Sequence, residues 1–210
     1  MTEPTTKTTQ GLVILDRDGV INVDRRDYVL TPAQWQPIPG SLEAIARLTD
    51  AGYRIGVATN QSAIGRGRLT EAALGEIHAR MHEVVRAHGG RIDHVAHCPH
   101  APSQACDCRK PAPGLLTRIA DALGADLENS VFVGDSLRDL QAARAVGCRP
   151  VLVRTGHGSE IADPGEDVAC FADLAAFVDA LLEATPDGPV DERDALRAGT
   201  DPRDRVASHG

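Results

Sequence analysis

The sequence has no long hydrophobic run and no basic tract, and each absence excludes a class of protein. No stretch of the 210 residues reaches the roughly 18 apolar residues that a membrane-spanning helix requires. The net charge of −8 at pH 7 argues against a nucleic-acid-binding surface. The first ten residues are polar and lack an apolar signal region. The sequence therefore predicts a cytoplasmic protein that binds neither membranes nor nucleic acids.

An inserted second domain and internal repeats are also absent. Hydrophobic residues make up 42% of the chain and charged residues 25%, which is ordinary for a globular protein. Residues 185–210 contain few apolar side chains and alternate in charge, so we expect a disordered tail there. Residues 1–10 are similar and predict a flexible N-terminus. One domain is therefore expected over residues 11–184, and without an obvious exposed apolar stripe we expect a monomer.

Short apolar runs alternate with segments of helical period along this domain. We expect strands at 12–15, 54–58, 92–95, 131–133, 151–153 and 168–171. We expect helices at 42–48, 70–84, 116–123, 137–146 and 174–181. Such alternation predicts an α/β fold, with a doubly wound, Rossmann-like parallel sheet flanked by helices. In these sheets ligands bind at the carboxyl ends of the strands, near the point where strand order switches.

Polar side chains follow three of the expected strands. Asp16, Thr59 and Asp135 each come just after a strand's carboxyl end, so we expect them to converge in one site. Asp18 lies two residues beyond Asp16 and can face the same cavity. An isolated Asp-x-Asp pair usually marks a solvated loop. Here TNQS, RKP and GDSLRD follow in order after later strands, and this combination favours phosphoryl transfer, with Asp16 as nucleophile and Asp18 as acid and base.

Two carboxylates beside a phosphate require a cation, and Mg²⁺ prefers oxygen ligands. We expect the side chains of Asp16 and Asp135 and the main-chain carbonyl of Asp18 to bind Mg²⁺. Asp139, one helical turn after Asp135, is either an outer support of this site or an exposed charge on the helix face.

The remaining catalytic groups must handle the phosphoryl charge. Thr59 offers a hydroxyl and an amide to the phosphoryl oxygens. Lys110 offers the positive charge that holds nucleophile and phosphate together. Arg109 can grip an anionic or hydroxylated substrate with its planar guanidinium group.

Three of the five cysteines and a histidine predict a second metal site. Cys98, His100, Cys106 and Cys108 lie within a dozen residues, and three thiolates with one imidazole complete a closed, tetrahedral site of the structural zinc type. The alternative is a set of free cysteines in a loop, which would be exposed to oxidation. Zinc would fasten the loop of residues 98–110 and position Arg109 and Lys110, which follow it directly.

These residues resemble the haloacid dehalogenase superfamily of aspartyl-phosphate phosphatases. The four signatures of that superfamily appear as LDRDG at 15–19, Thr59-Asn60, Lys110, and Gly134-Asp135-Ser136 with Asp139. The segments DRDGVINVD, TNQSAIGRG, CPH, CDCRKP and VGDSLRDLQAA resemble the branch without a large cap domain that acts on a heptose bisphosphate. The resemblance spans about residues 11–158. It implies a Mg²⁺-dependent phosphatase with a structural zinc ion and a role in making the activated heptose of lipopolysaccharide.

The resemblance also implies which residues bind the sugar phosphate. They are Asp24, Arg25, Arg26, Asp27 and Tyr28, then Thr59, Asn60, Gln61 and Ser62, and finally Arg109 and Lys110. The loop that reads DRRDYV is one residue longer than is usual in that branch. Ala63 stands where the branch often has glycine.

Two other functions compete with this interpretation. Histidinol-phosphate phosphatases share the DRDG motif and a similar zinc loop, so the zinc cluster discriminates poorly; TNQSAIGRG together with NVD and Tyr28-Val29 favours the heptose branch. A non-catalytic, zinc-stabilised binding protein would have lost a catalytic group. Asp16, Asp18, Thr59, Lys110 and Asp135 are all present, so the sequence does not support that alternative.

Overall fold

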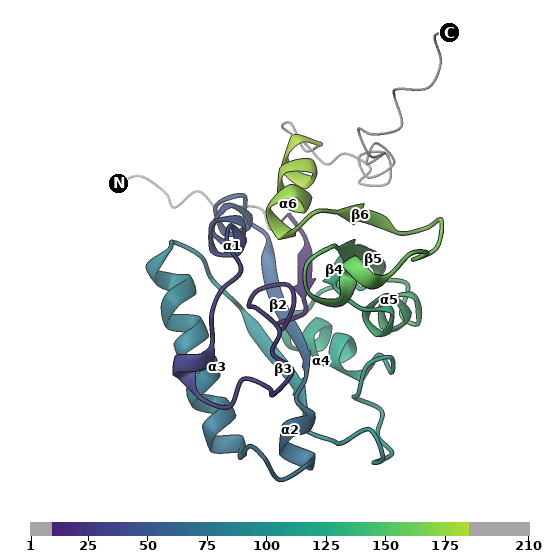
Figure 1. Cartoon of the computed structure of the whole chain (residues 1–210). Coiled ribbons are helices and arrows are strands. Elements are labelled where there is room, and N and C mark those ends of the chain that lie inside the picture. The colour runs from purple at the N-terminus through teal and green to yellow at the C-terminus, as the bar shows by residue number, and fades with distance from the viewer. Residues whose placement is uncertain (1–9, 185–210) are drawn as a thin grey trace, which may run out of the picture.

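The computed structural model describes residues 10–184, which form a six-stranded parallel sheet between two layers of helices (Figure 1). The flexible N-terminus predicted at 1–10, except residue 10, and the tail predicted at 185–210 lie outside the described residues. The strands are β1 (Leu12–Leu15), β2 (Arg54–Asn60), β3 (His94–Cys98), β4 (Ser130–Gly134), β5 (Arg149–Val153) and β6 (Ala169–Phe171). Their order, β3-β2-β1-β4-β5-β6, confirms the predicted doubly wound fold.

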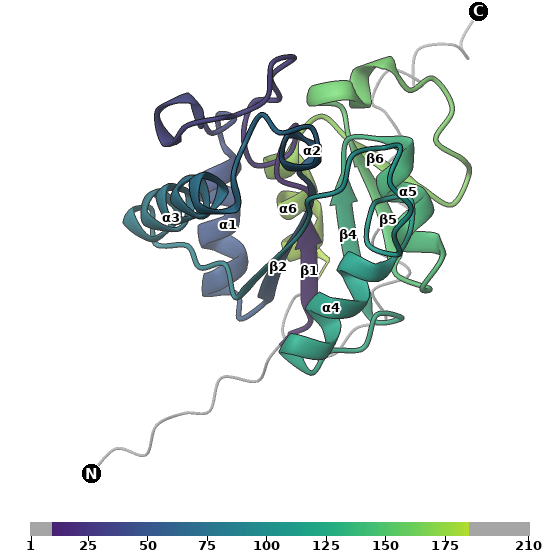
Figure 2. The same cartoon turned by 90° about the horizontal axis from the view of Figure 1, so that it is seen from below.

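Helices cover both faces of the sheet (Figure 2). One face carries α1 (Ser41–Asp50), α3 (Glu71–Ala87) and α6 (Leu174–Glu183), and the other carries α4 (Gly114–Leu123) and α5 (Leu137–Arg144). Side chains alternate along β1, so Val13 and Leu15 enter the core under α1 while Leu12 and Ile14 enter the core under α4. Burial on both faces explains why this strand is a continuous apolar run.

Several boundaries differ from the sequence prediction. The third strand begins at His94 rather than Ile92 and continues to Cys98, because its pairing with β2 starts at His94 opposite Gly56. Strand β2 extends to Asn60 for the same reason. Helix α5 ends at Arg144, two residues before the predicted end at Val146. Hydrogen-bond register, which apolar pattern does not encode, sets these ends.

Three short helical elements were not predicted. They are η1 (Pro32–Gln34), α2 (Ser62–Gly65) and η2 (Gly156–Glu160). In α3 the structure buries Val85 fully and Val84 only in part, the reverse of the predicted apolar position. The cap predicted for this helix is present, since the Thr70 hydroxyl accepts a hydrogen bond from the Ala73 amide at 3.1 Å. None of the helices within residues 10–184 is long and apolar enough to cross a membrane.

Strand order reverses between β1 and β4. From β1 the chain proceeds outward through β2 and β3, then crosses back to β4 and proceeds outward through β5 and β6. The two central strands pair in register, Leu15 opposite Val133, so their next polar residues, Asp16 and Asp135, emerge side by side. This is the location where doubly wound sheets bind ligands.

Candidate active site

A pocket of about 710 Å³ opens over the carboxyl ends of the central strands. It collects residues from the ends of β1, β2, β4 and β5 and from the loop before α4. Nearly all the predicted substrate and catalytic residues line it; they are Asp16, Asp18, Asp24, Arg25, Arg26, Tyr28, Thr59, Asn60, Gln61, Ser62, Arg109, Lys110 and Asp135. Asp27, predicted as a substrate residue, is exposed and is not among the lining residues.

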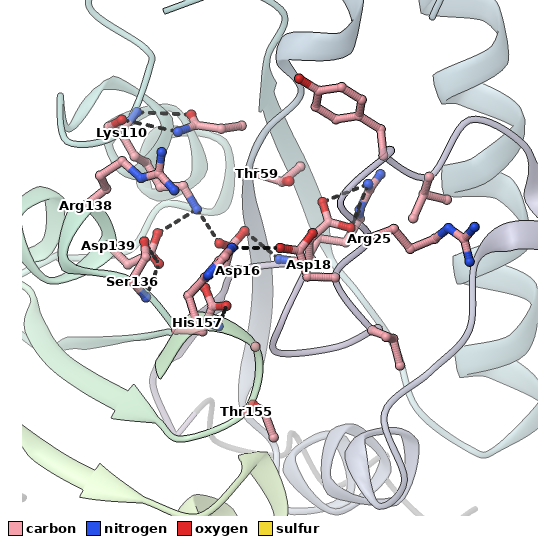
Figure 3. A pocket seen from close by; sticks show the side chains of 18 of the residues that line it. Asp16, Asp18, Arg25, Thr59, Lys110, Ser136, Arg138, Asp139, Thr155 and His157 are labelled. Atoms are coloured by element: carbon pink, nitrogen blue, oxygen red, sulfur yellow. Dashed lines mark hydrogen bonds and ion pairs between the residues drawn. The ribbon is translucent and has the colours of Figure 1, made fainter. Parts of the chain in front are cut away.

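The floor of the pocket is a buried cluster of three carboxylates and one ammonium group. Oxygens of Asp16, Asp135 and Asp139 all lie within 4.8 Å of one another. The Lys110 Nζ lies between two of them, 2.8 Å from the Asp16 Oδ2 and 2.7 Å from the Asp139 Oδ1 (Figure 3). One positive charge therefore faces three carboxylates in a site that water barely reaches.

The electrostatics of this cluster follow from that imbalance. Burial, with the nearby Asp139 and Asp135 carboxylates, raises the pKa of Asp16 well above its usual value, although Lys110 opposes the shift. Burial and Asp139 likewise raise the pKa of Asp135 to about 6. Burial disfavours the charged form of Lys110, but Asp139 and Asp16 more than offset this and raise its pKa. The cluster is thus short of positive charge, which a bound cation would supply.

Asp139 belongs to this cluster, so the interpretation as an exposed helix-face charge is wrong. The residue is 1% exposed and lies in the first turn of α5. Its Oδ2 accepts hydrogen bonds from the Ser136 amide at 3.0 Å and the Ser136 hydroxyl at 2.6 Å. The capping arrangement leaves its Oδ1 directed at Lys110, so the start of α5 supports the ammonium group.

Two glycines make room for Asp135. A Cβ atom added to Gly19 or to Gly156 would lie 2.0 Å from the Asp135 Oδ2, and both residues have positive φ. The His157 amide donates a hydrogen bond to the same oxygen at 2.9 Å. Backbone packed this closely holds the carboxylate in one orientation toward the cluster.

Asp18 occupies a different environment from Asp16. Arg17, 1% exposed, donates from Nη2 to both Asp18 carboxylate oxygens at 2.8 and 3.0 Å, and the Asn22 and Gln61 amides donate to them at 2.9 Å each. Burial raises the pKa of Asp18, but these donors, Arg17 foremost, outweigh it and lower the pKa. The Asp18 carboxylate lies outside the three-carboxylate cluster. Its predicted metal contact through the main-chain carbonyl stays a prediction.

The end of β2 connects the wall of the pocket to Lys110. The Asn60 side chain bonds both backbone groups of Lys110, accepting from its amide at 3.1 Å and donating to its carbonyl at 3.2 Å. The Lys110 Nζ also donates to the Ala58 carbonyl at 2.8 Å. Gln61 donates to the Thr59 hydroxyl at 2.9 Å, which orients that hydroxyl in the buried wall. A residue of the loop before α4 is thereby fixed at the sheet.

Several pocket residues were not predicted from the sequence. Arg17 sits between the two predicted aspartates. The sequence signal that could have found it is a charged residue between an apolar strand and a glycine. Thr155, Gly156 and His157 follow β5, so extending the rule about strand ends to that strand would have found them. The pocket lining includes six polar residues and one glycine that were not predicted. They are Arg17, Ser136, Arg138, Thr155, Gly156, His157 and Glu160.

The predicted zinc ligands also meet. Cys98, at the end of β3, lies 3.5 Å from the His100 Nδ1 and 3.8 Å from the Cys106 sulfur, and the Cys108 sulfur lies 3.3 Å from the same nitrogen. All four ligand atoms fall within 4.8 Å of one another. None of the five cysteines forms a disulfide bond with a described residue. The cluster precedes Arg109, whose guanidinium donates to the His100 carbonyl at 3.3 Å.

Comparison with known proteins agrees with this geometry. A family model described as haloacid dehalogenase-like hydrolase matches residues 4–147, and the chain belongs to that family. D-glycero-beta-D-manno-heptose-1,7-bisphosphate 7-phosphatase of Pseudomonas aeruginosa is 52% identical over 83% of this chain and 99% of its own length. The enzyme of that name from Escherichia coli is 42% identical over 69% of this chain and 79% of its own length.

A solved structure extends the likeness to three dimensions. The crystal structure of D,D-heptose 1,7-bisphosphate phosphatase from B. bronchiseptica, complexed with magnesium and phosphate, superposes with a TM-score of 0.80. The two chains are 46% identical, and the match covers 83% of this chain and 99% of the other.

Proposed function

We propose that this hydrolase removes the 7-phosphate of D-glycero-β-D-manno-heptose 1,7-bisphosphate, and so serves the synthesis of the activated heptose of lipopolysaccharide. The observation that carries the proposal is the buried cluster of Asp16, Lys110, Asp135 and Asp139 at the strand switch point. The relatives of that name, which match almost the whole length of the domain, supply the substrate.

The carboxylate cluster fits a magnesium ion. Asp16 and Asp135 offer buried carboxylate oxygens as ligands, and their raised pKa values reflect negative charge that Lys110 alone does not neutralise. A bound Mg²⁺ supplies charge neutralisation for the phosphoryl group and for the nucleophile. We assign Asp16 and Asp135 as side-chain ligands and Asp18 as a main-chain ligand, with Asp139 holding Lys110.

Asp16 is proposed as the nucleophile. It attacks phosphorus and forms an aspartyl-phosphate while the heptose leaves as an alkoxide. Its Oδ1 accepts a hydrogen bond from the Arg17 amide at 2.7 Å, and its Oδ2 is paired with Lys110, so the carboxylate has one orientation. Lys110 and the Thr59 hydroxyl then face the charge that develops on the phosphoryl oxygens.

Asp18 is proposed as the acid and base. It protonates the leaving alkoxide and later removes a proton from the water that hydrolyses the aspartyl-phosphate. The Arg17, Asn22 and Gln61 donors aim the carboxylate and keep it ionised before substrate binds, the state that the base step requires. The dianionic phosphate adds negative charge nearby, which favours protonation of Asp18 for the acid step.

Substrate selectivity is assigned to the rim of the pocket. Arg25 and Arg26 lie in the loop after β1, and Arg109 lies in the loop that follows the zinc ligands. Guanidinium groups bind phosphates bidentately, so these side chains suit the second phosphate of a bisphosphate. Asp24, Asn60, Gln61 and Ser62 offer hydrogen-bonding groups for sugar hydroxyls.

The cysteine cluster is proposed to bind structural zinc. Tetrahedral thiolate ligands about 2.3 Å from zinc lie about 3.8 Å apart. The Cys98 and Cys106 sulfurs are 3.8 Å apart, which fits. Burial and neighbouring thiols raise the pKa of Cys98 to about 12, which disfavours its thiolate form. A bound cation would stabilise the thiolate and offset this effect. We further propose that the protein is a monomer located in the cytoplasm. The cytoplasm is a compartment in which free thiols persist.

The test compares two substrates. We expect Mg²⁺-dependent phosphate release with a kcat/KM at least about 100-fold higher for the heptose bisphosphate than for L-histidinol phosphate, because only the former carries a second phosphate for the rim arginines. The names of the relatives favour the heptose substrate over the histidinol alternative. A preference for histidinol phosphate would overturn the substrate assignment, and absence of phosphate release from either would overturn the enzymatic function.

A further inference from the structure

A buried contact behind the active site leads from Asp18 to helix α3. Two nitrogens of the Arg17 guanidinium donate hydrogen bonds to Asp18. Nε lies 3.3 Å from Oδ1, and Nη2 lies 2.8 Å from Oδ2. The third nitrogen, Nη1, lies 3.4 Å from the Nε2 of His78. His78 does not line the pocket and comes from a helix 61 residues along the chain.

The chemistry of the pair fixes the state of His78. An arginine guanidinium has only donors and stays protonated, so the Nε2 of His78 must be the acceptor and its ring must be neutral with the proton on Nδ1. Burial and the adjacent Arg17 charge lower the pKa of His78 to about 3, which agrees with that state. A neutral acceptor is the only role the ring can have toward this guanidinium.

Neighbouring residues hold the imidazole in place. The ring of His97, on β3, meets the His78 ring edge to face with centroids 6.0 Å apart. The Nε2 of His97 in turn lies 2.9 Å from a carboxylate oxygen of Glu71, at the start of α3. Through His97, these contacts join α3 to the sheet at Glu71 and at His78, so the acceptor is held by rigid elements.

We propose that His78 is a positioning residue for the acid and base chemistry of Asp18, acting through Arg17. Without an acceptor at Nη1, a buried guanidinium N–H loses its partner, and Arg17 gains by rotating toward another one. Asp18 would then lose the rigid pair of hydrogen bonds that aims it at the leaving oxygen. His78 touches no substrate, so its removal leaves substrate binding intact and slows proton transfer. This inference rests on the proposed phosphatase function.

The test uses two substrates that differ in their need for an acid. The heptose alkoxide is a poor leaving group and requires protonation, whereas p-nitrophenolate leaves with little help. Because kcat/KM reports steps up to formation of the aspartyl-phosphate, we expect His78→Ala to lower it about tenfold for the heptose bisphosphate and less than about twofold for p-nitrophenyl phosphate. The loss for the sugar should appear in kcat, with KM within about twofold.

Two variants separate the hydrogen bond from packing. His78→Gln keeps an acceptor oxygen at a comparable distance from the helix and should restore most of the sugar activity. His78→Leu fills the space without an acceptor and should behave as His78→Ala. His82→Ala is the matched control, since His82 lies one turn further along α3 and Arg86 hydrogen-bonds its carbonyl rather than its ring. Circular dichroism and thermal melting establish that each variant is folded.

The outcomes distinguish this inference from the proposed function. Equal losses on both substrates, or full activity in a folded His78→Leu protein, would overturn the positioning role. Failure of His78→Gln to recover activity above His78→Leu would also count against it. A wild-type protein inactive on both phosphate esters would instead overturn the phosphatase assignment.

Discussion

The two clusters of candidate metal ligands are built in opposite ways. The cysteine cluster comes from one segment of eleven residues, 98–108, and its four ligand atoms complete a closed set. The carboxylate cluster joins Asp16 and Asp135, which directly follow two different strands, with Asp139 of helix α5, and all three line the pocket. The first is assembled within one segment that starts at the end of β3, whereas the second requires that β1 and β4 pair in the sheet.

The difference also concerns charge. The thiols surround one another and can bind a cation with no further partner, but the carboxylates need both Lys110 and a metal to balance them. A catalytic site whose charge changes during the reaction is expected to keep charges that are incompletely neutralised. A structural site that fastens a loop is expected to have its charges balanced by its metal. Variants in each cluster should therefore fail in different ways.

The largest effect is expected for Asp16→Asn. An amide cannot form the aspartyl-phosphate, so we expect kcat to fall by at least about 1,000-fold while the melting temperature stays the same or rises. Rapid-quench measurements with labelled substrate check this, and phosphorylated Asp16→Asn protein would refute the nucleophile assignment. Asp121→Asn, an exposed change on α4, is the control.

Lys110→Met should cost about 100-fold in kcat and also destabilise the protein, since three carboxylates are left without their ammonium partner. Adding Asp139→Asn to Lys110→Met should recover stability but not activity, because it removes one repulsive charge and restores no catalytic group. Urea denaturation and steady-state kinetics on wild type and the two variants measure both effects. Recovery of activity in the double variant would contradict a catalytic role for Lys110.

The metal-free carboxylate cluster should make stability depend on pH. An acid whose pKa rises from 3.8 in the unfolded chain to about 6 in the folded protein binds more protons when folded. Its contribution therefore favours folding at low pH and is lost as pH rises through about 4 to 6. In EDTA at pH 7.5 we expect Asp135→Asn to be more stable than wild type by about 3 kcal/mol, and at pH 4 by less than about 1 kcal/mol.

Magnesium should reverse that order. Wild type regains stability with Mg²⁺, whereas Asp135→Asn, which lacks a ligand, should respond little. Urea denaturation across the pH range, with and without Mg²⁺, provides the measurement. An Asp135→Asn advantage that persists unchanged at pH 4 would show that the carboxylate is not the source.

The smallest effect on chemistry is expected from the cysteine cluster. Cys106→Ser should lose zinc and raise KM about fivefold, because Arg109 follows the cluster directly, while kcat changes less. Metal analysis and kinetics check this against Cys170→Ser, which lies on β6 away from the cluster. Unchanged kinetics in zinc-free protein would separate the cluster from the substrate site.

Much of the carboxylate site could be predicted from the sequence because its strands are marked by apolar runs. In a parallel sheet the residues after such runs share one edge, so Asp16, Thr59 and Asp135 were placed together without knowledge of strand order. The cysteine cluster was predictable from spacing and ligand type alone. The four predicted ligand residues meet in the structure.

The sequence by itself determined the fold class and predicted which carboxylates come together and which cysteines and histidine form the second cluster, since local pattern and residue chemistry encode them. Only the tertiary structure decided the burial of Asp139 against Lys110, the different environments of Asp16 and Asp18, and the contact of Arg17 with His78. It also left Asp27 outside the pocket lining. These features depend on which side chains from distant segments meet and on how much water they exclude, and no local pattern carries that information.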